Sequence, residues 1–109
     1  MSILELKSTF TNLDQHIEYP IEGILSKVLL KDKNCQYTLF CLAKGTEISE
    51  HTSARNATVN VIEGEGILTL EGEDIKLVKG VFVVMPSNAP HALSAKENLC
   101  FLLTLSATE

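Results

Sequence analysis

Short apolar segments separated by turn-forming residues run through most of the chain, and this pattern restricts its possible folds more than any other feature. The segments are rich in Val, Ile, Leu, Thr and Phe, and several alternate apolar with polar residues, as strands with one buried face do. They span residues 24–31, 36–43, 58–64, 66–72, 74–80, 81–86 and 98–106. Clusters of Gly, Asn, Asp and Pro lie between them and favour tight reversals of the chain.

No window carries the apolar i, i+3, i+4, i+7 stripe of an amphipathic helix. Short strands at nearly even spacing in a chain of 109 residues predict an all-β sandwich or closed barrel. The segment 67–77 predicts a hairpin, and we expect its turn at Gly72, Glu73 and Asp74, which tolerate left-handed backbone conformations.

The length of the chain suits a single domain, and its 45% content of hydrophobic residues is enough to form a buried core. Residues 1–23 show few strand signals and include Tyr19-Pro20, which favours an extended link. We therefore expect an N-terminal arm over residues 1–23 that packs outside a β-barrel domain over residues 24–109.

Charge excludes two classes of partner. The net charge is −5, and Arg55 is the only arginine, so no basic stripe is available for nucleic acid or for an anionic membrane surface. No segment approaches the about 20 apolar residues of a membrane span.

The N-terminus lacks the apolar region of a secretory signal. The cysteines Cys35, Cys41 and Cys100 form no CxxC pair, and their odd number without an export signal predicts reduced thiols in the cytoplasm. Cys41 and Cys100 lie in apolar runs, so we expect both in the core.

His51 and His91 each follow a glycine in a longer motif. The first motif is GTEISEHTSARNATVNVIEG, residues 45–64, and the second is GVFVVMPSNAPHALSA, residues 80–95. In an extended strand residues i and i+2 share a face, so Ser53 is expected on the same face as His51. The two motifs, in this order and with this spacing of glycine, proline and histidine, resemble those of the cupin superfamily over about residues 36–105. The resemblance implies a jelly-roll β-barrel with His51 and His91 facing a central cavity.

The cupin motifs usually supply three histidines and one glutamate to a divalent metal ion. Matched by position, this chain offers His51, then Ser53 for the second histidine, Ala57 for the glutamate, and His91. Two imidazoles alone seldom hold a divalent ion tightly, because catalytic zinc sites usually have three protein ligands.

Three nearby carboxylates could replace the missing glutamate. They are Glu47, Glu50 and Glu63. Alternation along a strand turns Glu50 away from His51, and the other two lie near turns, so a replacement is not indicated.

Three interpretations of the His51 and His91 pair follow. In the first, the pair marks a ligand-sized cavity in which a metal is weakly held or absent. In the second, the pair binds Fe, Mn, Ni, Cu or Zn with help from water or a carboxylate. In the third, it is a buried structural pair.

The candidate ligand-binding residues are those of the motifs and their surroundings: His51, Ser53, Ala57, His91, Met85 and Arg55. Arg55 either contacts an anionic ligand at the cavity mouth or is a solvated loop residue, which is the more common case. Phe82, Met85, Phe101 and Leu103 are expected in the core, with some of them lining the barrel lumen.

The chain has no Gly-x-Ser-x-Gly elbow, phosphate loop, dinucleotide fingerprint or fixed pair of carboxylates. The first functional hypothesis is a module that binds a small molecule in the barrel lumen. The second is a metal-dependent enzyme, resembling cupin dioxygenases or isomerases, with an incomplete two-histidine site. The third is a sensor or regulatory protein that acts through a separate partner, since small cupins resemble the sensor halves of transcription regulators.

We also expect a homodimer. The apolar segment 24–31 and the arm before it could cover a neighbouring molecule, and closed two-fold pairs are the commonest assembly.

Overall fold

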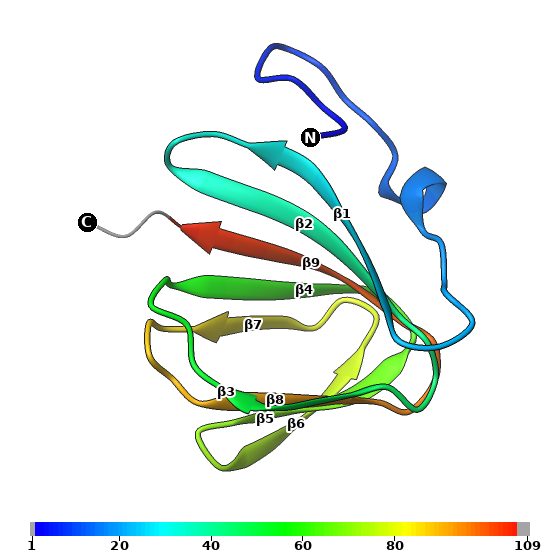
Figure 1. Ribbon diagram of the computed structural model, residues 1–109, viewed down its shortest axis with the longest axis vertical. Coiled ribbons are helices and arrows are strands. Elements are labelled where there is room, and N and C mark those ends of the chain that lie inside the picture. The colour runs from blue at the N-terminus through cyan, green and yellow to red at the C-terminus, as the bar shows by residue number, and fades with distance from the viewer. Residues whose placement is uncertain (1, 107–109) are drawn as a thin grey trace.

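The computed structural model describes residues 2–106, which form two antiparallel sheets facing one another (Figure 1). The larger sheet has the strand order β1-β2-β9-β4-β7, and the smaller has the order β3-β8-β5-β6. The predicted all-β jelly-roll barrel is therefore confirmed. The strands are β1 (Ile24–Lys31), β2 (Cys35–Leu42), β3 (Glu47–His51), β4 (Ala57–Glu63), β5 (Glu65–Leu70), β6 (Glu73–Val78), β7 (Phe82–Met85), β8 (His91–Ala95) and β9 (Leu99–Ser106).

The main core lies between the two sheets and is built by alternation along the strands. In β4, for example, Ala57, Val59 and Val61 are buried and the residues between them are not. Residues of both sheets complete the cluster: Leu42, Leu68, Leu77, Val83, Met85, Leu93, Ala95, Leu99 and Phe101. Each large apolar side chain buried in this way contributes about 1.5–3 kcal/mol, so this layer holds the two sheets together.

Most strands lie where the apolar segments predicted them, and β1 coincides with its segment, 24–31. The short strands β3 and β8 were not among the predicted segments, because their sequences, EISEH and HALSA, each contain only one large apolar residue. They are strands because they pair with one another, and β8 also pairs with β5.

The predicted β5–β6 hairpin is present, but its turn lies one residue earlier than expected. Glu71 and Gly72, with φ of 50° and 82°, form a two-residue turn. Positive φ at both positions matches the twist of the flanking strands. Asp74 is already in β6, where it pairs with Thr69 and accepts a hydrogen bond of 2.6 Å from the Thr69 hydroxyl.

The segment before β1 is irregular apart from a short 3-10 helix, η1 (Leu13–His16). It runs along the outside of β1 (Figure 1), and the backbone N–H groups of Ile3 and Leu4 donate to the carbonyls of Val28 and Leu29. Within residues 2–106 no helix has the length and apolarity needed to cross a membrane.

A second apolar cluster lies under this segment, on the outer face of the larger sheet. Its buried members are Leu29, Leu39, Cys41 and Cys100. Leu13, Ile17 and Tyr19 of the preceding segment pack against them. The segment thus covers the barrel of its own chain, and the homodimer stays a prediction.

Phe82 is a correction to the expected core. It lies on the outer face of β7, at the edge of the larger sheet, and is 61% exposed, whereas its neighbour Val83 is buried. The apolar run 81–86 gave no sign of which alternate residues face the interior, and only the packing of β7 against β4 decides it.

Candidate functional site

The candidate site is a cavity of about 130 Å³ between the two sheets. Its walls are almost entirely apolar, and they come from both sheets: Phe40, Ile48, Val59, Leu68, Met85, Leu93, Phe101 and Leu103. The polar lining residues are His51 and His91. Mostly apolar walls with a few polar groups at one place are typical of small-molecule sites.

The two histidines form a contacting pair at the edge of this cavity. They are direct partners across β3 and β8, and their ring centroids lie 4.2 Å apart with an interplanar angle of 61°. His51 is exposed and His91 is half-buried, so the pair lies between the apolar interior and solvent.

A β-bulge in β3 turns His51 toward the cavity. Ile48 pairs with Leu93 and His51 pairs with His91, so β3 uses one more residue than β8 over the same stretch. Strict alternation would place Ile48 and His51 on opposite faces, because they are three positions apart. The bulge absorbs the extra residue, so both side chains lie on the inner face; bulges often orient residues beside a site in this way.

Backbone carbonyls orient both imidazole rings. The Nδ1 atom of His51 lies 2.9 Å from the carbonyl oxygen of Ser49, and Nδ1 of His91 lies 2.9 Å from that of Ala89. A carbonyl oxygen only accepts hydrogen bonds, so each Nδ1 must carry a proton and donate it. In the neutral ring Nε2 is then the acceptor, and the site presents a pair of such nitrogens.

Two loops are joined beside the histidines. The N–H of Asn88 donates to the carbonyl of Ser53 at 2.6 Å, and the N–H of Ser87 donates to Oδ1 of Asn56 at 2.8 Å. Asn88 has φ of 69°, in the left-handed region that favours glycine. Asparagine tolerates this conformation better than most residues, so the loop keeps its shape.

The structure places three of the six predicted ligand-binding residues in the cavity lining, namely His51, His91 and Met85. Ala57 is 4% exposed and belongs to the core around the cavity. Ser53 does not share a strand face with His51, because β3 ends at His51. The Ser53 hydroxyl instead accepts the N–H of Arg55 at 3.2 Å, in the loop.

Several lining residues were not predicted. Phe40, Ile48, Val59, Leu68 and Leu93 all come from positions that alternate inward along their strands. Alternation in the sequence marks such positions but does not say which of two faces is the interior.

The residues present do not fit the four-ligand metal site that the motif resemblance implies. Glu63 accepts a hydrogen bond from the hydroxyl of Tyr19, which packs on the outer face of the larger sheet. Glu47 lines an outer groove, and Glu50 is exposed. Across residues 2–106 no group of three or more His, Cys, Asp or Glu side chains is arranged to hold a metal ion. The imidazoles of His51 and His91 are the donors that remain.

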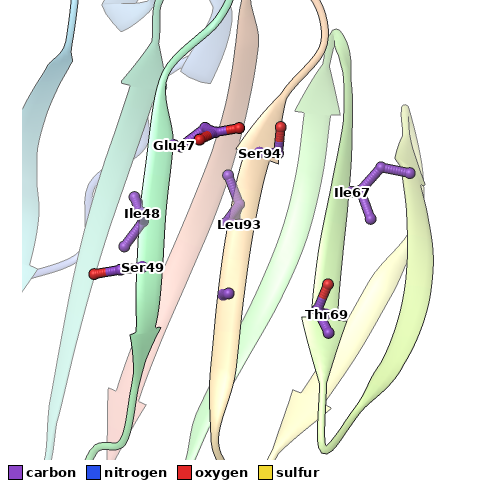
Figure 2. Close-up of a pocket in the computed structure, with 8 residues that line it drawn as sticks. Glu47, Ile48, Ser49, Ile67, Thr69, Leu93 and Ser94 are labelled. Atoms are coloured by element: carbon purple, nitrogen blue, oxygen red, sulfur yellow. The ribbon is translucent and has the colours of Figure 1, made fainter.

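The outer groove lies on the opposite face of the smaller sheet and has a volume of about 480 Å³. Figure 2 shows its lining, which includes Glu47 and Ser49 from β3, Ser94 from β8 and Thr69 from β5. Its polar side chains face solvent, where water competes for every hydrogen bond. The cavity between the sheets, with its largely apolar lining, is therefore the stronger candidate site.

Comparisons with known proteins agree with the fold. Residues 38–104 match the family model described as Cupin domain. A protein of unknown function from Streptococcus pyogenes is 31% identical, with a TM-score of 0.83 over 94% of this chain and 90% of that one. A cupin superfamily protein from Desulfitobacterium hafniense is 24% identical, with a TM-score of 0.84 over 94% of each chain. A cupin 2 conserved barrel domain protein from Leptotrichia buccalis is 34% identical, with a TM-score of 0.81 over 88% of this chain and 47% of that one. No curated protein matches the chain.

Proposed function

The chain belongs to the cupin family, and on this premise we propose that it binds a small organic molecule in the cavity between its sheets, with His51 and His91 as polar anchors. One observation carries the proposal. The apolar cavity ends at two imidazoles whose Nδ1 protons are already used by backbone carbonyls. A ligand that hydrogen-bonds to either ring must therefore do so at Nε2.

The volume limits the size of the ligand. The volume of the cavity is about 130 Å³. An engineered apolar cavity that binds benzene has a similar volume, about 150 Å³. The apolar walls favour a ligand body of one aromatic ring or a short branched aliphatic chain. A sugar or a nucleotide would leave its polar groups unpaired against these walls.

The histidine pair limits the polar group of the ligand. A neutral imidazole accepts at Nε2, so it binds a hydroxyl or amine that donates. A protonated imidazole donates from the same atom and binds a carboxylate. Phenols, small aromatic amines and benzoate-like acids are thus the classes of ligand that match both the walls and the anchors.

Thermal denaturation with a panel of phenol, catechol, aniline and benzoate tests the proposal. A ligand present at about 100 times its Kd stabilises the folded state by about 2.7 kcal/mol, which raises the Tm of a domain of this size by about 10 °C. We expect the shift to be lost in His51→Ala and His91→Ala. Ser94→Ala in the outer groove is the control and should keep it. A panel that leaves the Tm of the wild-type protein unchanged would sink the proposal.

A metal-dependent enzyme is the second candidate. The observation in its favour is the adjacency of the two rings, whose centroids lie 4.2 Å apart. Elemental analysis of protein purified without chelator distinguishes the two functions. Near-stoichiometric Fe, Mn, Ni, Cu or Zn that is absent from His51→Ala would favour the enzyme, and metal-free protein after addition of each ion would exclude it.

A further inference from the structure

A pair of buried thiols lies on the other side of the larger sheet from the ligand cavity. Cys41 in β2 and Cys100 in β9 are direct partners in the antiparallel pairing of these strands. Their sulfur atoms are 3.8 Å apart, and both residues are 0% exposed. Direct partners in antiparallel strands have Cα separations of about 4.5–5.5 Å, which lie within the range that a disulfide bridges.

The N-terminal segment covers this pair. Leu13, Ile17 and Tyr19 pack against the cluster that contains both cysteines. The Tyr19 hydroxyl donates to Oε2 of Glu63 at 2.6 Å and so ties the segment to β4. These contacts shield the two thiols from solvent.

The covering segment is held more weakly than the barrel beneath it. Over residues 2–23 its only helix is η1, with four residues, none of them buried. Segments with few buried contacts open locally at a small fraction of the global unfolding free energy. The thiols can therefore become accessible while the strands that carry them stay paired.

We propose that Cys41 and Cys100 are an oxidisable dithiol that a small peroxide converts to a disulfide, and that the segment before β1 controls access to it. One thiol gives up its proton and its sulfur attacks hydrogen peroxide; an S–O bond forms, the O–O bond breaks, and the leaving hydroxide takes up that proton as water. The second thiol likewise gives up its proton and attacks the sulfenic sulfur; the S–S bond forms, the S–O bond breaks, and the hydroxide leaves with the proton as a second water. In total the two thiols lose two electrons and two protons, and hydrogen peroxide is reduced to two molecules of water.

The closed state protects the pair chemically as well as sterically. Burial, and next the proximity of Cys41, raise the pKa of the Cys100 thiol. A protonated thiol is a poor nucleophile, so the reaction needs the segment to open. Cys35, at the start of β2, is half-buried, whereas Cys41 and Cys100 are buried.

The test uses the full chain with Cys35→Ser, so that only the pair can react with hydrogen peroxide. We expect loss of both free thiols and a mass lower by two hydrogens. Trypsin should release residues 34–44 and 97–109 as one linked peptide. Recovery of Cys41 and Cys100 as thiols, or as separate sulfinic acids, overturns the proposal. Cys41→Ser is the control that cannot form the bond.

Control of access is tested with Tyr19→Phe in the same background. Loss of its hydrogen bond to Glu63 should speed disulfide formation about two- to tenfold. Tyr37→Phe removes a hydroxyl from β2 beside the same cluster and should leave the rate unchanged. Equal rates in wild-type and Tyr19→Phe proteins would overturn the role given to the covering segment.

Discussion

Gly64, the last residue of the first histidine motif, lies where β4 passes into β5 with φ of +99°. A Cβ at this position would overlap the carbonyl oxygen of Asn98 and lie 2.7 Å from the Cα of Leu99. Both obstacles are backbone atoms, so a rotamer change cannot relieve them. Gly64→Ala therefore requires a shift of the chain at the start of β9, where Leu99 is fully buried.

The cost of this substitution has two parts. A positive φ costs alanine about 1–2 kcal/mol relative to glycine. Displacing a packed core residue costs about 1–3 kcal/mol more. Alanine also lowers the conformational entropy of the unfolded chain, which offsets about 0.4–1 kcal/mol of this loss of stability. We expect Gly64→Ala to lower the free energy of unfolding by about 2–4 kcal/mol.

Gly80→Ala is the matched control. Gly80 has φ of +92°, but no atom lies within 4 Å of the Cβ that alanine would add. Only the conformational term applies, and the expected loss is about 1 kcal/mol. Urea denaturation followed by circular dichroism measures both variants. Equal losses in the two variants, or a Gly64→Ala protein within about 0.5 kcal/mol of wild type, would refute the steric reasoning.

Deletion of Glu50 should remove the β3 bulge and place His51 two positions after Ile48, on the same inner face, so ligand-induced stabilisation should be retained as in Glu50→Ala; its loss in the deletion variant alone would show that the bulge itself orients His51. Burial, and then the hydrogen bond to Glu63, raise the pKa of Tyr19 above its usual value of 10.0. The associated stability is fully present below pH 10.0 and is lost as the pH rises above it, so the urea midpoint should fall more in wild type than in Tyr19→Phe between about pH 8 and pH 10.5. Leu68→Ala should cost about 2–5 kcal/mol in urea denaturation and widen the cavity, so that substituted phenols bind better than phenol; unchanged ligand preference would show that Leu68 does not limit the cavity.

Much of the architecture follows from local sequence. Alternation of apolar and polar residues located most strands, because a strand with one buried face must place apolar side chains at every second position. The motif spacing identified His51 and His91, and both line the cavity. The same local rules did not locate β3 and β8, because a strand of five residues with a single large apolar side chain depends on its partners for stability.

Tertiary structure decided what the strands bring together. His51 faces the cavity because the register between β3 and β8 includes a bulge, and Ser53 does not follow it because the strand ends first. The apolar sequences around Cys41 and Cys100 predicted that both lie in the core, but only the pairing of β2 with β9 places their sulfur atoms in contact. The alternation of apolar and polar residues involves only neighbours in the chain, so it is visible in the sequence of a single strand. Register, bulges and the choice of inner face depend on the energy of packing segments that are distant in the chain, so they emerge only when the two sheets form together.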